Sequence, residues 1–582
     1  MPEEPKIFNY ETLQNTPAEK LPEIISQYDI IELECIDLSA YEKLHFKDDA
    51  KVNIAGKEPL PPQIDFTNCS EVILSGRDTS KIPPQKLKEG SSFYYMPRNS
   101  ETNFYLNNLP PLYPNVDISR CQNVTIVSTD LKNIPDLKFK DGANINLSGC
   151  QNLPKNLDLS KCAAVSLSGC DLSTLKNITF KENAVIDLSD CDLSQIKNIT
   201  FPKGASVILS GAQNLPENLD FSKCAAVSLS GCDLSTIKNI KFKEESSVNL
   251  SNCTNFPENL DLSKCAAVSL SGCDLSTLND LKFKEDSSVD LSECTNFKKD
   301  LDLSQCASVS LKKCDINNIN LKFKDGAFVD LSQTAPVAIG ELDLSNCDYV
   351  NLSKANLLLV DDIKFKDNAK VNLDKAQNLP DIDVSNLSVV DLSSCDLNEI
   401  KNLTFKDNAE INLSGAQNIP ENLDVSNCKT VWLHMGNAHT ITAGDANIVL
   451  GGIGAKQVDV SNLKNFTISD ETHEMYGENY ISMLTTKSIT FKDQQQYEEF
   501  LQNPKNKPLP KNCKVLFKSD ENLKTSLKEQ TGEVPTSSIA TARTVRLNKA
   551  LERKEQEAPA QSHENTPNTS KVPLTTHRQN TR

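Results

Sequence analysis

The chain has 582 residues, of which 38% are hydrophobic and 6% are aromatic, and its formal net charge is -18. This acidic balance disfavours broad binding to nucleic-acid phosphates, which depends on Lys and Arg. No apolar run approaches the roughly 18–20 residues that cross a bilayer, so we expect no membrane span. The N-terminus, MPEEPKIFNYETLQ, is polar and acidic and lacks the apolar region of a Sec-type signal peptide.

In chain order, the first expected element is an N-terminal cap over residues 1–40. The segment from Pro17 through Tyr28 suits one short amphipathic helix, which would cover the open end of the first coil of a repeat. Residues 41–76 contain the first, weaker copies of that repeat.

Residues 77–114 break the repeat and are rich in Pro and Tyr. We expect this segment to loop out of the stack as an insertion. Such insertions often carry binding contacts, which makes Tyr94 and Tyr95 candidate partner-binding residues. A disordered spacer is the alternative interpretation.

One unit recurs from residue 115 to residue 470. Nearly identical copies read DLSKCAAVSLSGCDLSTLKN from Asp158 and DLSKCAAVSLSGCDLSTLND from Asp261. The Leu that closes a V-x-L triplet returns every 19 to 21 residues. A second apolar anchor, usually Phe or Leu, stands eight residues before it.

Each unit holds two short stretches with the two-residue period of a strand, such as Ile178–Phe180 and Ile186–Leu188. A unit this small cannot bury its own apolar face, but stacked copies can. We therefore predict an all-β protein, a parallel β-solenoid of ~20–21-residue coils with small α/β caps and a disordered C-terminal tail. About sixteen coils spaced ~4.8 Å apart would give a rod of roughly 75 Å.

The chain has 19 cysteines, which recur in phase with the repeat instead of in loop-closing pairs. Reduced, buried thiols are therefore expected instead of a disulfide framework. The second residue after each V-x-L-S is Cys, Ala or Thr, which indicates an inward corner that admits only a small side chain. Metal binding by stacked thiols is the alternative, but no C-x-x-C pair frames a tetrahedral site.

The coils alternate between two kinds, so that the true period is near 41 residues. The residue directly before the second anchor faces outward. From Asp220 to Asp383 this residue is alternately Asp and Lys in successive coils. In-register stacking would place each Lys between two Asp residues. Because a slip of one coil would bring like charges together, the pattern predicts a register device; a plain solvated charged face is the alternative.

The segment Val165–Leu175, VSLSGCDLSTL, resembles the leucine-rich-repeat core, and LPENLDFS from Leu215 to Ser222 resembles the short repeats of bacterial leucine-rich-repeat effectors. For that family the resemblance implies a curved solenoid whose strand face binds other proteins. This sequence departs from the family pattern in two ways that argue against such curvature. Cys or Ala replaces the usual Asn, and a second strand takes the place of the helix on the outer side of each coil. A straighter parallel β-prism is the alternative architecture.

Beyond the repeat, residues 471–530 are expected to form a C-terminal α/β cap with a strand at 488–491, a helix at 494–502 and a strand at 514–517. Residues 531–582 form a flexible basic tail in this interpretation. Its basic, polar end resembles the C-terminal export signals of bacterial secretion substrates.

The motifs of common enzymes are absent: there is no Walker loop, no H-E-x-x-H and no nucleophile elbow. We therefore expect no catalytic residue, no metal site and no cofactor. No Arg occurs between Cys121 and Cys513. The repeat region therefore lacks the side chain that most often binds phosphate through two parallel hydrogen bonds.

An outward stripe formed by the middle residue of each V-x-L is small and polar until it reaches Trp432, the one tryptophan of the chain. Aromatic anchors dominate interface energetics, so Trp432 and His434 are candidate partner-binding residues, with Asp391 and Asn412 earlier in the stripe. Packing of Trp432 under the C-terminal cap is the competing interpretation.

The sequence thus predicts a monomeric, non-enzymatic scaffold that binds a protein partner. The implied location is the cytoplasm, or a host cell reached by a Sec-independent route. The rival hypotheses are an enzyme with its site in the 77–114 insertion or the C-terminal cap, and a structural or surface spacer.

Overall fold

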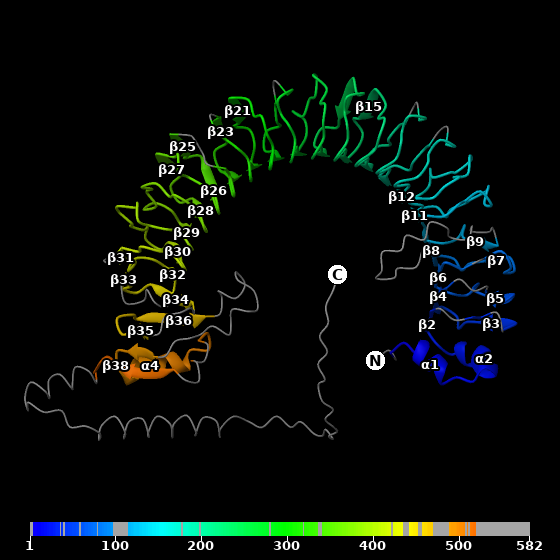
Figure 1. Cartoon of the computed structure of the whole chain (residues 1–582), viewed down its shortest axis with the longest axis horizontal. Coiled ribbons are helices and arrows are strands. Elements are labelled where there is room, and N and C mark those ends of the chain that lie inside the picture. Colours follow the sequence, from blue (N-terminus) through cyan, green and yellow to red (C-terminus); the bar gives the residue numbers. More distant parts are fainter. Residues whose placement is uncertain are drawn as a thin grey trace, which may run out of the picture.

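The computed structural model describes residues 4–519, except 35–36, 39–40, 57–59, 78, 97–114, 176–177, 197–198, 279–280, 318, 336–339, 421–422, 435–440, 452–456, 470–487, 507–508 and 510–512. In this part the chain winds into a parallel β-solenoid that curves into an arc (Figure 1). The basic tail over 531–582 lies outside the described residues.

The inner, concave side of the arc is one parallel sheet of 23 strands (Figure 1). In spatial order its strands are β1 (Ile7–Phe8), β2 (Ile30–Glu34), β4 (Lys51–Ala55), β6 (Glu71–Ser75), β8 (Ser92–Met96), β10 (Asn123–Ile126), β11 (Asn144–Asn146), β12 (Ala164–Ser166), β13 (Val185–Asp187), β14 (Ser206–Ile208), β16 (Ala226–Ser228), β18 (Ser247–Asn249), β19 (Ala267–Ser269), β20 (Ser288–Asp290), β22 (Ser308–Ser310), β24 (Ala327–Asp330), β26 (Cys347–Asn351), β28 (Lys370–Asn372), β29 (Val389–Asp391), β30 (Glu410–Leu413), β32 (Thr430–His434), β34 (Asn447–Gly451) and β36 (Asn465–Ser469).

The outer, convex side carries short two-stranded sheets instead of a continuous one. They pair β3 (Lys43–His45) with β5 (Gln63–Asp65), β7 (Gln85–Lys86) with β9 (Val116–Asp117), β15 (Asn218–Phe221) with β17 (Asn239–Phe242), β21 (Asp300–Leu303) with β23 (Asn320–Phe323), β25 (Glu341–Leu344) with β27 (Asp362–Phe365), and β31 (Leu423–Asp424) with β33 (Ile441–Thr442). The second strand predicted in each coil is thus present in only part of the described coils.

Strand pairing differs between the two sides of the solenoid. The inner strands form one continuous parallel ladder, which holds neighbouring coils ~4.8 Å apart. The outer strands pair only in separate twos, as β15 does with β17, and form no continuous ladder among the described residues. The continuous sheet lies on the concave side of the arc (Figure 1). The arc agrees with the leucine-rich-repeat-like solenoid that the sequence predicts, and not with the straighter β-prism that is its alternative (Figure 1).

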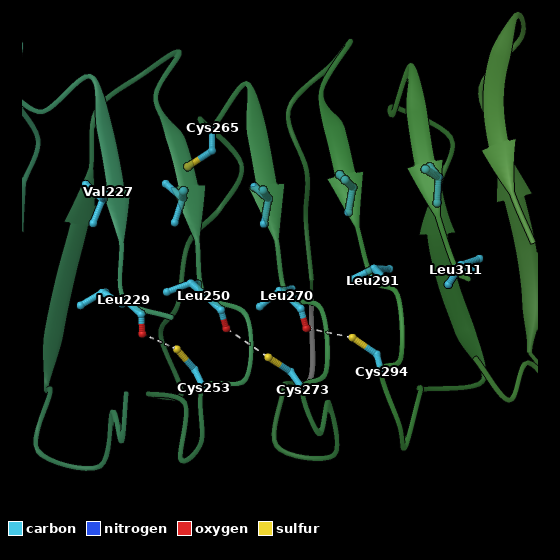
Figure 2. Close-up of a cluster of buried hydrophobic side chains, with 14 of the residues drawn as sticks. Val227, Leu229, Leu250, Cys253, Cys265, Leu270, Cys273, Leu291, Cys294 and Leu311 are labelled. Carbon is cyan, nitrogen blue, oxygen red and sulfur yellow. Dashed lines mark hydrogen bonds between the residues drawn. The ribbon is translucent and has the colours of Figure 1, made fainter. Parts of the chain in front are cut away.

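The core lies between the two sides and consists of stacked columns of the repeat. The closing leucines of the V-x-L triplets, such as Leu229, Leu250 and Leu270, are fully buried (Figure 2). The small-residue column runs beside them, and 17 of the described cysteines are buried as free thiols. Burial raises their pKa, for example that of Cys253 to about 12.

The acid–base alternation is in register where the outer strands pair: Asp220 lies opposite Lys241, Asp302 opposite Lys322, and Asp343 opposite Lys364. The carboxylates are also used locally. Asp220 accepts a hydrogen bond from the Ser222 backbone N–H at 2.9 Å, and Ser222 lowers the pKa of Asp220 more than Lys241 does. The Asp–Lys contacts between coils therefore add little to the stability of a turn that each Asp already stabilises by accepting hydrogen bonds from the following Ser.

A second row of lysines reaches across two coils and makes the 41-residue period visible. Lys181 contacts Asp141 at 3.0 Å, Lys284 contacts Glu245 at 2.9 Å, and Lys366 contacts Asp325 at 2.7 Å and Asp348 at 2.8 Å. Lys284 and Lys366 belong to K-F-K coils, and Lys181 belongs to a coil that reads T-F-K. Each contacts an acid two coils earlier, past the intervening D-L-S coil, and Lys366 also contacts Asp348 of that intervening coil.

The N-terminal end differs from the single expected helix. It holds α1 (Tyr10–Gln14), a 3-10 turn (Ala18–Lys20) and α2 (Leu21–Ile25). Leu21 and Ile25 are buried, so α2 covers the first coils as a cap would.

At the other end, the expected strand–helix–strand order is present as β37 (Ser488–Phe491), α4 (Gln494–Gln502) and β38 (Lys514–Phe517). β37 pairs in parallel with β38 and with β35 (Gln457–Asp459). Among the described residues, no helix has both the length and the apolar character needed to cross a bilayer.

The segment at 77–114 was expected to leave the stack. In its described part, β8 pairs in parallel with β6 and with β10, so residues 92–96 continue the concave sheet. This coil lacks the V-x-L motif, with Phe93 and Tyr95 filling the two inward positions. The sheet therefore has more strands than the about sixteen coils that the motif reveals.

Candidate partner-binding surface

Outward side chains of the concave sheet form two rows, one on each side of the buried Val of every coil. Between β12 and β22 most of them are Ser, Asp or Asn, and the others are Ala164, Val185, Ile208, Ala226 and Ala267. Many bond to one another: Ser166 donates to Asp187 at 2.8 Å, and the Ser292 and Ser310 hydroxyls lie 2.7 Å apart. Because these groups are already partnered, this part of the face offers few hydrogen bonds to a ligand.

Three of the residues singled out in the sequence are brought together by the register. Asp391 lies opposite Asn412, and Asn412 lies opposite Trp432, on the neighbouring strands β29, β30 and β32. The Asn412 amide donates to the Asp391 carboxylate at 3.1 Å. His434 follows on β32, where its backbone pairs with Gly451. Its side chain lies outside the described part.

Trp432 lies on the floor of a groove of about 770 Å³. The lining residues are Glu410, Thr430, Trp432, Asn447, Val449, Thr467, Asn503 and Lys505. All except the last two are outward residues of the concave sheet, whereas Asn503 and Lys505 follow α4. The cap therefore faces Trp432 across this groove and leaves the side chain half-buried.

The two tyrosines of the 77–114 segment lie on β8, far along the arc from Trp432 (Figure 1). Tyr94 faces out of the sheet between Ile73 and Thr125 and is half-buried. Tyr95 is fully buried, and its hydroxyl donates to the backbone carbonyl of Arg77 at 2.9 Å. Tyr95 is thus a core residue that no partner can reach, because it fills the place that Leu takes in regular coils.

An aromatic pair on the concave face was missed in the sequence. Phe328 on β24 and Tyr349 on β26 stack with ring centroids 5.3 Å apart and an interplanar angle of 21°. Phe328 is 55% exposed, which is unusual for a phenylalanine. Both stand directly before the buried Val, in the second outward row of the sheet. The strand period predicts an outward side chain at both positions.

The same part of the concave face carries charges of both signs. Asp330 and Asp391 lie on β24 and β29, whereas Lys370 on β28 is exposed between Tyr349 and Val389. Asp374, two residues after β28, pairs with Lys375 at 3.3 Å. Asp391 accepts hydrogen bonds from the Ser393 backbone N–H at 2.9 Å and from its hydroxyl. Within the described residues no three His, Cys, Asp or Glu side chains are grouped so that they could hold a metal ion.

Comparisons with known proteins name no relative. No family model matches the chain, and no curated protein does. Among solved structures it is similar to the one titled "Crystal structure of LRIM1/APL1C complex", at 11% identity over 91% of this chain and 77% of that chain, with a TM-score of 0.14. That score is too low to support an argument. The fold itself, a parallel sheet lining the inside of a curved stack of leucine-bearing coils, is that of a leucine-rich-repeat-like solenoid (Figure 1).

Proposed function

We propose that this protein is a non-catalytic scaffold that binds a protein partner on its concave face, between β24 and β34. The stacked pair of the exposed Phe328 and the half-buried Tyr349 is the observation that carries this proposal. Exposed aromatic groups on a rigid sheet are typical of interface hot spots, since they bury a large area while losing little conformational freedom.

The extent of the surface supports a macromolecular partner. Four strand steps separate β26 from β32, so that Tyr349 and Trp432 lie ~19 Å apart along the face. The row Asp391–Asn412–Trp432 closes the far end of this span. Two aromatic anchors at this separation fit within one protein interface of ordinary size.

Charge indicates which kind of partner suits this protein. The whole chain carries -18, whereas the surface itself presents both signs, with Asp330 and Asp391 near the exposed Lys370. A partner of basic overall charge would be attracted, and its docking face would need both signs to be complementary. Such charges mainly speed association and select among partners.

The finer proposal is that the scaffold is a secreted bacterial effector that works as a monomer. Its support is the sequence resemblance to bacterial leucine-rich-repeat effectors. The basic segment at 541–582, with eight Lys or Arg and four Glu, adds to it. In this proposal the cytoplasm is the site of synthesis, and a Sec-independent route delivers the protein to a host cell.

The test compares the double variant Phe328→Ala/Tyr349→Ala with the control Val185→Ala. Val185 is 45% exposed on β13, in the same outward row but outside the proposed surface. Tagged proteins are used to recover partners from cells, with quantitative mass spectrometry. We expect one protein to be recovered about tenfold less by the double variant, because two anchors are lost, and equally by the control.

Thermal midpoints of all three proteins provide the folding control. Exposed aromatic side chains contribute little to the core, so the midpoint of the double variant should stay near that of the parent. Equal recovery by the double variant and the parent would contradict the proposal, as would a loss matched by Val185→Ala.

A further inference from the structure

The groove at the C-terminal end of the concave face has a floor made by four consecutive strands. Outward residues of β30, β32, β34 and β36 form it, with the ring of Trp432 beside Val449. Thr430 and Asn447 line one side of the floor, and Thr467 continues it on the last strand. Since all these residues stand on paired strands, their positions are set by the sheet ladder.

The wall of the groove is the short segment that follows α4. Asn503 and Lys505 face the floor, and the neighbouring Asn506 ties this segment to the sheet. The side chain of Asn506 accepts from the Ile468 backbone N–H at 2.9 Å and donates to the Phe500 carbonyl at 2.7 Å. Phe500 in turn stacks on Phe466, with centroids 5.8 Å apart. These contacts hold the segment after α4 against the edge strand β36. The groove therefore exists before any ligand binds.

The groove continues toward α4. A second hollow of about 420 Å³ shares Asn447, Thr467 and Asn503 with it. This extension gives room for a chain-like ligand with more than one unit.

The lining is polar without a cluster of like charges. Four uncharged side chains can donate or accept hydrogen bonds: Thr430, Asn447, Thr467 and Asn503. The extension adds Lys429, Lys464, Asp445 and Glu499, but its lysines are paired with acids: Lys429 with Glu410 at 2.5 Å and Lys464 with Asp445 at 2.7 Å. An anionic polymer would need several cations that are not already paired, and an apolar side chain would leave the amides and hydroxyls without partners.

We propose that this groove binds a neutral oligosaccharide, with one sugar ring stacked on Trp432. A pyranose has an apolar face that fits an indole ring and a rim of hydroxyls that fits amide and hydroxyl side chains. The sugar can be free or carried by a glycoprotein partner. In the second case the inference deepens the proposed function and rests on it; binding of free sugar does not depend on any protein partner.

The first experiment uses Trp432 as its own probe, because it is the only tryptophan in the chain. The full-length protein is titrated with neutral di- and trisaccharides built from glucose, galactose, mannose or N-acetylglucosamine, and tryptophan emission is recorded. We expect at least one saccharide to shift the emission saturably with a Kd of about 1 mM or tighter. No change with any of them up to about 10 mM would overturn the proposal.

Variants locate the binding. Asn447→Ala and Thr467→Val each remove one hydrogen-bonding group from the groove and should raise the Kd about tenfold. The control Asn144→Ala makes the same change at the corresponding outward position of β11, far along the arc, and should leave the Kd unchanged. Thr467→Val keeps the side-chain shape, so it remains informative if Asn447→Ala folds poorly. Equal affinities in the groove variants and the parent would overturn the proposal.

Two further experiments distinguish a free sugar from a glycan carried by a protein partner. A sugar that binds the free protein and also competes with the captured partner indicates a glycan on that partner; one that binds without competing indicates a free ligand. Either result agrees with the groove proposal. Unglycosylated peptides that shift Trp432 emission while saccharides do not would overturn it in favour of a peptide site. Phe328→Ala/Tyr349→Ala should leave sugar affinity unchanged, so the two proposals fail independently.

Discussion

Cysteines of the small-residue column do more than fill a corner. The thiol of Cys253 donates to the Leu229 carbonyl of the preceding coil at 3.0 Å, and Cys273 repeats this contact with Leu250 at 3.2 Å (Figure 2). The sequence predicted the small size of this position because Ala and Thr also occur there. The hydrogen bond between coils could not be predicted, because it depends on where the next leucine carbonyl points.

At the scale of one residue, we expect Cys253→Ala to lower stability by about 1–2 kcal/mol, because it removes a weak hydrogen bond and leaves a small void. The reverse change, Ala212→Cys, places a thiol at a position of the same column where the repeat has Ala, and should raise stability. Urea unfolding midpoints measure both effects. If the two variants move the midpoint in the same direction, the thiol contact contributes nothing.

At the scale of a single element, the turn after each inner strand requires an unusual backbone conformation. The residue before each small corner has positive φ in nearly every described coil: it is Gly231 at 73° and Gly272 at 74°, but Lys354 at 57° and Asn252 at 57°. Glycine adopts this conformation without strain, whereas a side chain with a Cβ does not. The path of the coil therefore requires this backbone conformation even at positions where the residue is not glycine.

We expect Gly231→Ala to destabilise the protein by about 1 kcal/mol and Lys354→Gly to stabilise it by a similar amount. Steric clash does not explain the first effect, since a Cβ on Gly231 would come no closer than 3.9 Å to another atom. Thermal midpoints of the two variants test this pair. A stabilising Gly231→Ala would show that the backbone conformation carries no strain.

At the scale of the whole molecule, the buried thiols together make the free energy of unfolding depend on pH. Their pKa values are raised by burial, to about 11 for Cys191 and about 12 for Cys294. Above pH 9 an unfolded chain releases thiol protons that the folded chain retains. Stability from this source is thus fully present below pH 9 and falls as pH rises toward the folded-state values, by about 1.4 kcal/mol per pH unit for each such thiol.

We therefore expect a steep loss of stability between pH 9 and pH 11, seen as a falling urea midpoint in a pH series. The slope should decrease in a Cys253→Ala/Cys273→Ala double variant, which has two fewer ionising thiols. A midpoint that stays constant across this range would show that the thiols ionise equally in both states.

Local patterning determined much of this protein from the sequence alone. The twenty-residue period, the inward Val and Leu columns, the reduced cysteines and the helix at 494–502 follow from side-chain alternation and helix signals that act over a few residues. The coil of β8 was missed because Phe93 and Tyr95 replace the motif. The stacking of Phe328 on Tyr349 depends on the register between β24 and β26, which includes a register shift that the repeat pattern does not record.

Only the tertiary structure decided the curvature and the groove. Curvature builds up over many coils, and a pattern of a few residues does not determine the small rotation between neighbouring coils (Figure 1). The groove joins Trp432 to Asn503 and Lys505, which come from the cap. No local pattern records that contact, because it depends on where the last coil ends and how the cap folds back over the sheet.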